Sequence, residues 1–347
     1  MHSLKKLLFF TYLLSFSLTA QQEAGIKFLS KFKLPGISIR AIEVTEKNTL
    51  WFAGSEGRYG RIINEKLEID SISHQGRFPQ FRSIAYNGEF IFLLSIENPA
   101  LLYKIDPAKP LGQYQMVYKE SDPKVFYDSL AFFDKNNGIA MGDPTEDCLS
   151  VIKTTNGGDS WTKLPCNELL KVADGEAAFA ASNSNIAIVN KKIWMVTGGA
   201  KARVFYSEDY GTTWKVNETP IAQGGKMTGI FTVDFYDEKN GLIMGGNWED
   251  KKNGEASKAR SKDGGLTWNL IAQNSLPGYI SCVQYLPESA AKKILAVSTE
   301  GMFYSKDGGS TWKQIEEKGY YSLRFIDKHN AWVATNEEIA KIKLQNL

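Results

Sequence analysis

An eight-residue phrase occurs four times in the second half of the chain and constrains the fold more than any other feature. It reads Ser/Thr, any residue, Asp/Asn, any residue, Gly, any residue, Ser/Thr and Trp. The Asp or Asn side chain can accept hydrogen bonds from nearby backbone N–H groups, the Gly supplies a backbone angle that other residues resist, and the Trp covers the turn with an apolar face. Each copy therefore predicts a braced hairpin turn. The copies are residues 154–161, 207–214, 261–268 and 305–312.

The spacing of the copies indicates a repeat architecture, because they begin at intervals of 53, 54 and 44 residues. Self-similarity at a period of about 40–50 residues is typical of β-propellers, in which each repeat is one sheet. A second repeated phrase accompanies the first. It consists of a strand-like run, a turn of Asp, Asn and Gly residues, and another strand-like run. Clear or degenerate versions occupy residues 44–54, 86–94, 132–142, 180–197, 235–245, 285–298 and 325–334.

The seven versions of this second phrase predict an all-β fold, a propeller of about seven blades with four strands each. The last blade is incomplete, because only residues 338–344 remain for a strand after its second one. Residues 26–34 precede the first inner strand and belong to no other blade. We expect them to supply the missing outer strand and so close the ring, which removes exposed sheet edges.

Residues 1–20 have the pattern of a secretory signal peptide: two lysines, an apolar run and a small-residue end. We expect cleavage after Ala20, leaving residues 21–347 as a single propeller domain in the periplasm or outside the cell. The apolar run is short for a bilayer span, and an uncleaved membrane anchor is the alternative. The remaining sequence contains no second apolar stretch of spanning length.

Charge excludes one class of partner. The sequence has 41 Lys and Arg against 39 Asp and Glu, and two of the lysines, Lys5 and Lys6, belong to the predicted signal peptide. The mature chain is therefore close to neutral, and it has no basic run of the kind that binds nucleic acid. We expect a monomer whose unknown partner is a protein or a glycan.

The turn phrase resembles the Asp-box, or bacterial neuraminidase repeat. Phrases at residues 142–144, 175–182 and 197–199 are similar to a bacterial family often labelled "oxidoreductase", which is related to the photosystem II stability and assembly factor (YCF48-like) propellers. The resemblance spans nearly all of the mature chain, although the first two blades have no recognisable box. It implies the propeller fold, with these residues bracing the hairpins: Asn156, Trp161, Asp209, Trp214, Asp263, Trp268, Asp307 and Trp312.

The residues give no support to redox chemistry. No Gly-x-Gly-x-x-Gly stands between a strand and a helix, and the three histidines, His2, His74 and His329, do not form a metal-binding pattern. We therefore expect no cofactor and no metal.

A glycoside hydrolase is the rival to a non-catalytic module, since Asp-boxes occur in sialidases. Arg40, Arg82 and Arg324 fall on predicted inner strands, and Asp128 with Glu176 could form a carboxylate pair. The Arg-Ile-Pro phrase of sialidases is absent, and Arg324 is out of phase with the other two arginines. We therefore assign no catalytic residue and favour an exported binding or assembly module, with a carbohydrate-active enzyme as the alternative.

Cysteine placement allows one disulfide. Cys148 lies 8 residues before Asn156, and Cys166 lies 8 residues after Gly158. In an antiparallel hairpin centred on this turn the two cysteines face each other, and an oxidising compartment would permit the bond. Cys282 lies on an apolar inner strand and is expected to be a buried thiol.

The inner strands also predict a binding site at one mouth of the central channel. We align the predicted inner strands on Val44, Tyr86, Phe132 and their equivalents. The residues four positions before these, at the start of each strand, include polar and aromatic side chains. The connections after the second strands should open at the same end. Polar groups that converge on a concavity are the usual basis for a binding-site hypothesis. The predicted mouth residues are Arg40, Arg82, Asp128, Asp143, Glu176, Arg203, Asn247 and Tyr321, with Phe231 for apolar contact.

Overall fold

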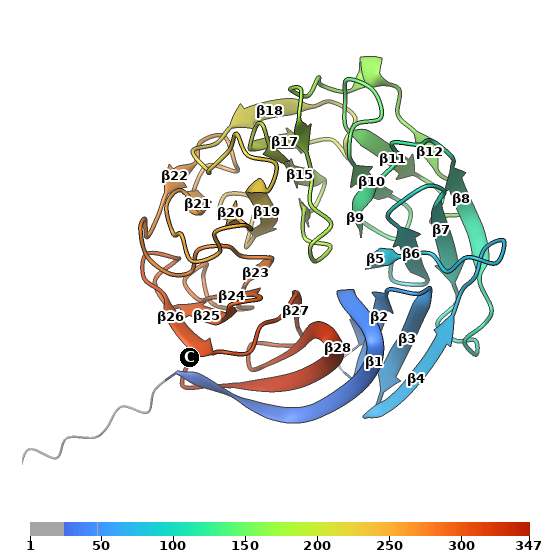
Figure 1. Ribbon diagram of the computed structural model, residues 1–347, viewed down its shortest axis with the longest axis horizontal. Helices are drawn as coiled ribbons and strands as arrows, with labels where there is room; N and C mark the ends of the chain where they lie inside the picture. Colours follow the sequence, from blue (N-terminus) through green and yellow to red (C-terminus); the bar gives the residue numbers. More distant parts are fainter. Residues whose placement is uncertain (1–23, 47) are drawn as a thin grey trace, which may run out of the picture.

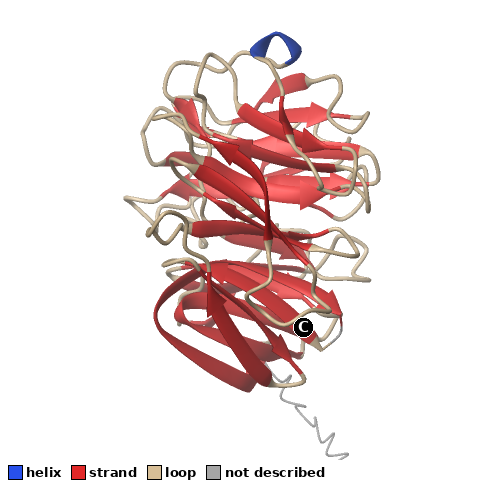
Figure 2. Ribbon diagram, turned by 90° about the vertical axis from the view of Figure 1, so that its right-hand side faces the viewer, coloured by secondary structure: helices blue, strands red, loops and turns tan. Residues whose placement is uncertain are grey.

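The computed structural model describes residues 24–46 and 48–347, and the predicted signal peptide at residues 1–20 lies outside them. Within the described residues the chain forms strands and one short 3-10 helix, η1 (Cys166–Glu168). The sheets are arranged radially around a central axis (Figure 1). Viewed from the side, their strands cross the thickness of the ring (Figure 2). The all-β propeller is therefore present.

The prediction of about seven blades is wrong, because the described strands form six hydrogen-bonded sheets. One six-stranded sheet has the order β27 (Ser322–Phe325), β28 (Asn330–Gln345), β1 (Gly25–Glu46), β2 (Thr49–Gly54), β3 (Arg58–Ile63) and β4 (Lys66–Ser71). The other has the order β13 (Glu176–Ala177), β16 (Gly198–Gly199), β19 (Thr228–Phe235), β20 (Gly241–Asn247), β21 (Lys258–Ser261) and β22 (Asn269–Leu270).

The remaining four sheets have four strands each. The first two are β5 (Phe81–Tyr86), β6 (Ile91–Ser95), β7 (Ala100–Ile105) and β8 (Gln115–Glu120), then β9 (Tyr127–Phe132), β10 (Gly138–Gly142), β11 (Ser150–Thr154) and β12 (Thr162–Lys163). The last two are β14 (Ile186–Val189), β15 (Lys192–Val196), β17 (Arg203–Ser207) and β18 (Lys215–Glu218), then β23 (Cys282–Tyr285), β24 (Ile294–Ser298), β25 (Gly301–Ser305) and β26 (Lys313–Glu316).

The length of β1 explains why the strands form six sheets rather than the seven predicted. This single strand of 22 residues pairs with β28 along its first part, from Gly25 opposite Gln345, and with β2 along its second part. What the sequence divides into a first and a last blade is therefore one continuous sheet. The predicted pairing of the two chain ends is present, and it closes the ring at the lower part of Figure 1.

Apolar side chains fill the space between neighbouring sheets. Trp51, Trp194 and Trp332 are almost fully buried, at 1%, 0% and 1% exposure. Trp194 of β15 stacks on Phe235 of β19 with ring centroids 3.6 Å apart, which joins two sheets face to face. Aromatic pairs of this kind add to the hydrophobic term. The packing fixes the sheets around the axis and so positions the inner strands at the channel.

The four repeated turns each join the two outermost strands of a sheet at the outer rim, and they share one hydrogen-bond pattern. In the second copy the Asp209 carboxylate accepts the N–H groups of Thr212 and Thr213 at 3.1 and 2.8 Å. The Ser207 hydroxyl donates to Asp209 and accepts the N–H of Gly211. In the third and fourth copies serine and glycine make the same contacts, and the aspartate accepts the N–H of Thr267 or Thr311. Each turn thus satisfies its own backbone donors.

The turns also hold the sheets to one another. Lys153 of β11 donates its ammonium to the carbonyl of Gly211 at 3.0 Å, and Arg260 of β21 donates to the carbonyl of Gly308 at 2.7 Å. In each case a cation on one sheet bonds a turn of the next. The tryptophans Trp161 and Trp268 are buried, at 7% and 8% exposure, whereas Trp214 and Trp312 are half-buried.

Cys148 and Cys166 are joined by a disulfide, with their Cα atoms 5.6 Å apart. The bond ties the segment before β11 to the one after β12. Cys282 is a buried free thiol. Among the described residues no helix is long and apolar enough to cross a bilayer.

Candidate functional site

Residues 178–185 lie across the central channel instead of forming the inner strand predicted around Ala180. The inner strand of this part of the ring is β14, which begins only at Ile186. Residues 178–185, the crossing segment below, lie toward the centre of the ring in Figure 1. Strands all around the channel hold it, through the contacts Arg40 to Ala181, Arg82 to Ala180, Asn183 to Ile84, Ser184 to Thr232, Ser182 to Ser281 and Arg324 to Asn183.

Four of the predicted mouth positions share one backbone irregularity. Arg40, Arg82, Asp128 and Phe231 each stand where the register shifts between an inner strand and the second strand. A β-bulge adds one residue on one strand, bends that strand and re-aims the side chain of the extra residue. The bulge recurs at equivalent places on β1, β5, β9 and β19; Arg40 and Arg82 are partly exposed there, whereas Asp128 and Phe231 are buried.

Arg40 and Arg82 lie close together and form the cationic part of this mouth. Each is partly exposed and donates to a carbonyl of the crossing segment at 3.3 Å. Burial lowers the pKa of Arg82 and the charge of Arg40 lowers it further, while Asp128 and Glu97 oppose this. The Arg40 guanidinium lies over the ring of Tyr321 at 4.1 Å. We call Arg40, Arg82 and Tyr321 the arginine mouth.

Asp128 and Asp143 are two of the acidic residues predicted for this mouth, and burial raises the pKa of both. Asp128 is completely buried, and neither carboxylate oxygen has a hydrogen-bond partner of ordinary geometry among the described residues. Burial, reinforced by Asp143, raises the pKa of Asp128 well above its usual range. Asp143 accepts the N–H of Ala178 at 2.8 Å, and burial raises its pKa to about 6. Near neutral pH Asp143 is therefore mostly ionised and offsets part of the positive charge of the two arginines.

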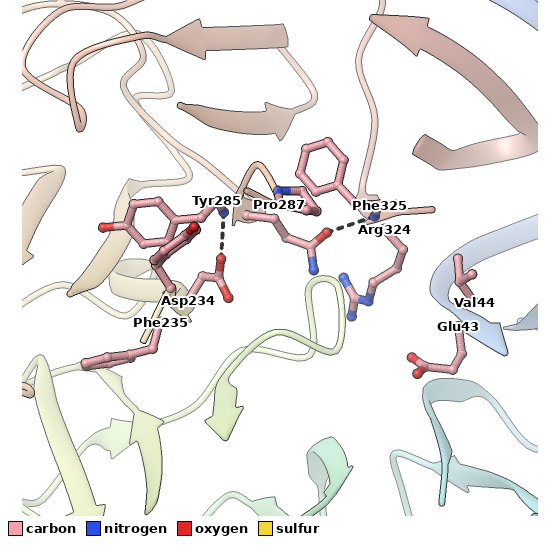
Figure 3. A pocket seen from close by; sticks show the side chains of 10 residues that line it. Glu43, Val44, Asp234, Phe235, Tyr285, Pro287, Arg324 and Phe325 are labelled. Carbon is pink, nitrogen blue, oxygen red and sulfur yellow. Dashed lines mark hydrogen bonds between the residues drawn. The ribbon is translucent and has the colours of Figure 1, made fainter. Parts of the chain in front are cut away.

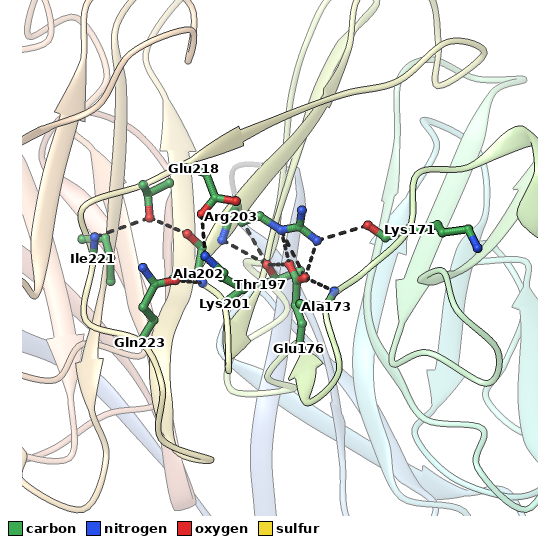
Figure 4. A network of polar contacts seen from close by, with 11 residues as sticks. Lys171, Ala173, Glu176, Thr197, Lys201, Ala202, Arg203, Glu218, Ile221 and Gln223 are labelled. Carbon is green, nitrogen blue, oxygen red and sulfur yellow. Dashed lines mark hydrogen bonds and ion pairs between the residues drawn. The ribbon is translucent and has the colours of Figure 1, made fainter.

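Glu176, Arg203 and Asn247 make separate contacts and do not join the arginine mouth. Glu176 lies on the short strand β13, and its carboxylate accepts Arg203 Nε at 3.0 Å, the Thr197 hydroxyl at 2.6 Å and the N–H of Ala173 at 2.8 Å (Figure 4). Asn247 ends β20 and accepts the N–H of Glu249 at 2.9 Å. The alignment placed Glu176 on an inner strand, but this part of the chain leaves the strand pattern to form the crossing segment.

A cavity of about 390 Å³ opens next to the arginine mouth. Its wall includes Glu97, which is near enough to Arg82 to affect the pKa of that residue. Phe78, half exposed at 50%, and the partly buried His74 form another side. The cavity therefore lies near Arg82 and has both apolar and polar walls.

Sequence reasoning missed a second cavity, further along the inner strands. It has a volume of about 340 Å³, and its wall carries Glu43, Asp234, Gln284 and Arg324 (Figure 3). A neighbouring cavity of about 230 Å³ shares all four residues. Each of the four stands one position before an aligned hydrophobic residue: Val44, Phe235, Tyr285 or Phe325. A polar residue one position before an aligned hydrophobic residue was the sequence signal that could have revealed this cavity. We call this region the acidic cavity.

Among the described residues no group of three or more His, Cys, Asp or Glu is placed to hold a metal ion. The arrangement instead offers two charged regions, the arginine mouth and the acidic cavity, with the crossing segment bonded to arginines in both. Polar groups in concave sites with apolar walls are suited to binding.

Comparison with known proteins shows the fold but no family. No protein-family model matches the chain. A probable oligoxyloglucan-reducing end-specific xyloglucanase of Neosartorya fischeri is 24% identical over 191 residues, which covers 50% of this chain and 21% of that protein. The chain thus spans about a fifth of the length of this curated relative.

Solved propellers match over almost the whole chain. YCF48 bound to a D1 peptide has a TM-score of 0.64 and 11% identity, and the match covers 90% of this chain and 95% of that one. YCF48 from Cyanidioschyzon merolae has a TM-score of 0.65 and 13% identity, covering 93% and 99%. The WD40 propeller domain of Doa1 has a TM-score of 0.63 and 11% identity, covering 92% and 97%. A YCF48-like β-propeller therefore describes the fold.

Proposed function

We propose that this chain is a binding or assembly module that takes a carboxylate group of a partner polypeptide at the arginine mouth. The observation that carries the proposal is the pair Arg40 and Arg82, two guanidinium groups held together with main-chain carbonyls as their hydrogen-bond acceptors. The solved YCF48 with a bound D1 peptide supports a polypeptide as the ligand class. We further propose that residues 1–20 export the chain and that the braced turns are Asp-boxes with a structural role.

No carboxylate among the described residues contacts the arginine pair directly, although Asp128 and Glu97 act on Arg82 from further away. Within the described residues neither Arg40 nor Arg82 forms an ion pair, and the buried Nε of Arg40 has no hydrogen-bond partner. Arginine binds a carboxylate through two parallel hydrogen bonds, which are stronger than those between neutral groups. Tyr321 already stacks on Arg40 and leaves an aromatic surface beside the mouth for an apolar neighbour of the carboxylate.

Peptides of identical sequence, ending in either a free carboxylate or an amide, test this proposal. Labelled pools of both kinds are titrated with the protein, and fluorescence polarisation reports binding. The free-carboxylate pool should bind more tightly, and Arg40→Ala with Arg82→Ala should weaken its binding by roughly a hundredfold, about tenfold for each charged contact. Arg58→Ala removes an exposed arginine and should change nothing. Equal binding of both pools, or full binding by the folded double variant, would refute the proposal.

A carbohydrate-active enzyme is the second candidate, and the sequence match to the xyloglucanase favours it. The carboxylates considered for it are poorly placed, because Asp128 and Glu176 are only 0% and 2% exposed. Arg324 bonds Asn183 of the crossing segment and lines the acidic cavity, so it does not form a cluster with Arg40 and Arg82. Release of sugar from xyloglucan oligosaccharides or chromogenic glycosides by the purified protein would establish this candidate.

A further inference from the structure

We propose that the acidic cavity binds an organic cation, an alkyl ammonium or guanidinium group of the kind that lysine and arginine side chains carry. This site is separate from the arginine mouth and goes beyond the proposed function. Along β1, Glu43 follows Arg40 by three residues, which corresponds to about 10 Å of extended strand. A ligand at one site therefore leaves the other free.

The first argument is unmatched negative charge. Glu43 of β1 and Asp234 of β19 face the cavity (Figure 3), and neither forms an ion pair among the described residues. Asp234 accepts the N–H of Tyr285 at 2.6 Å, whereas no hydrogen bond is formed by the Glu43 carboxylate within the described part of the chain. Both carboxylates are partly exposed in the cavity, and their negative charge in a concave site favours a ligand of opposite charge.

The second argument concerns Arg324, the cation already in the wall. Its Nη1 donates to the carbonyl of Leu323 at 2.7 Å, and its Nη2 donates to the carbonyl of Asn183 at 3.0 Å. These bonds direct the terminal nitrogens of Arg324 toward main-chain oxygens rather than toward either carboxylate. With both carboxylates ionised and one arginine, the wall keeps a net charge of about −1. A monovalent cation balances that charge.

The third argument is the shape and chemistry of the remaining wall. Phe235, Tyr285 and Phe325 supply aromatic surface around the carboxylates. Aromatic faces attract ammonium and guanidinium groups and also cover the methylene chain behind them. The Gln284 side chain accepts the N–H of Phe325 at 3.2 Å, so its position is fixed by the backbone. An apolar stem with a cationic end fits these walls, whereas a metal ion would meet only two carboxylates and prefers more oxygen ligands.

The electrostatics give the site a pH dependence. Burial raises the pKa of Glu43 to about 7 and of Asp234 to about 6, and Arg324 partly opposes both shifts. Tyr285, whose pKa is also raised by burial, stays neutral between pH 5.5 and 8. A bound cation favours the ionised carboxylates, so affinity should be highest near pH 8 and fall as the pH decreases through 7 and then 6.

The experiment compares a cation with a neutral ligand of the same shape. Nα-acetyl-lysine amide, Nα-acetyl-arginine amide and the uncharged Nα-acetyl-norleucine amide are titrated into the protein and followed by saturation-transfer NMR. The two cations should bind at pH 8, and the norleucine compound should not. Their Kd should rise roughly tenfold at pH 5.5 and roughly tenfold in Glu43→Gln. Butylammonium, in a further arm, distinguishes a small amine from a residue within a peptide.

Glu46→Gln is the matched control, because Glu46 is an exposed carboxylate on the same strand and should leave binding unchanged. Melting temperature separates a binding role from a structural one. If Glu43 served only to neutralise Arg324, Glu43→Gln would lower the melting temperature, whereas a residue kept for a ligand leaves it equal or higher. Equal binding of norleucine, unchanged binding by Glu43→Gln, or displacement of the lysine compound by Ca²⁺ would overturn the proposal.

Discussion

The aspartates of the outer rim and the acids of the channel respond to the fold in opposite ways. At the rim, burial alone would raise the pKa of Asp209, but hydrogen bonds from Thr213 and Ser207 hold it below its usual range. In the channel, burial raises the pKa of Glu43, Asp128 and Asp234, and hydrogen bonds and charges only partly compensate. A carboxylate thus accepts several hydrogen bonds at the rim, whereas in the channel it accepts few or none.

The difference separates structural from functional roles. A fully bonded carboxylate stabilises the folded chain, because its bonds are lost on unfolding. A buried carboxylate with few partners destabilises it, and such groups tend to mark functional or strained sites. We therefore expect changes at the rim to lower the free energy of unfolding, and neutral replacements in the channel to keep or raise it.

The largest effect should come from a rim tryptophan. Trp268 is 8% exposed and packs against Phe235 with ring centroids 5.9 Å apart. Trp268→Ala should lower the free energy of unfolding by about 3–5 kcal/mol, because it leaves a cavity between two sheets. Urea unfolding measures this, with Leu266→Ala in the same turn, 55% exposed, as a control near zero. An unchanged urea midpoint for Trp268→Ala would contradict the bracing role.

The disulfide should give the next effect. Cys148 and Cys166 are separated by 18 residues in sequence, and closing a loop of that length stabilises by about 3 kcal/mol in the chain-entropy model. Replacing both cysteines by serine should lower the free energy of unfolding by that amount. Alkylation of the exported protein without reduction should label neither cysteine. Labelling of both would show that the bond does not form in the native compartment.

Asp209 tests the hydrogen bonds of the turn. Asp209→Ala removes the acceptor for Thr212 and Thr213 and should lower the free energy of unfolding by about 1–3 kcal/mol. Asp209→Asn should have a smaller effect, because Asn156 occupies the same position in the first copy. Since the folded pKa of Asp209 is lowered, its stabilisation is present above the unfolded pKa of about 4 and is lost as the pH falls below it. Urea midpoints at pH 7 and pH 3 should show this loss in the wild type and not in Asp209→Asn.

Asp128 should give the smallest effect, with the opposite sign. Asp128→Asn removes a buried carboxyl whose ionisation is disfavoured by folding, and it should raise the free energy of unfolding by about 1 kcal/mol at pH 8. The raised folded pKa means that Asp128 is most favourable at low pH, below its unfolded pKa, and becomes unfavourable as the pH rises. The difference between variant and wild type should therefore shrink at pH 4. A variant less stable than wild type at pH 8 would show that the charge of Asp128 is satisfied after all.

The sequence could predict the features that repeat. Turn phrases at a steady spacing indicated all-β sheets around an axis, and the alignment put Arg40, Arg82 and Asp128 at equivalent places on their strands. Those places coincide with bulges, so equivalent residues are re-aimed together. The alignment did not need to know about the bulges, because β1, β5, β9 and β19 each have one at the same position.

The sequence could not predict the features that depend on how the chain closes and bends. One continuous strand, β1, merges the first and last repeats, and nothing in its composition marks that continuity. Glu43 reaches the acidic cavity from the position just before Val44, a face that the alignment did not assign to the channel; Gln284 and Arg324 do the same on strands without a bulge. The crossing segment replaces a strand because arginines from distant strands bond its carbonyls, and local propensity carries no information about those partners.

The crossing segment has a consequence for folding kinetics. It is bonded by Arg40 near the start of the chain and by Arg324 near its end, each separated from its partner by 141 residues in sequence. Because each bond joins residues far apart in sequence, we expect the segment to dock late and its contacts to be largely absent from the transition state. Interactions of that kind slow unfolding more than they speed folding. The centre of the ring therefore governs how long the folded molecule persists, even though the apolar surface that drives folding lies between the sheets.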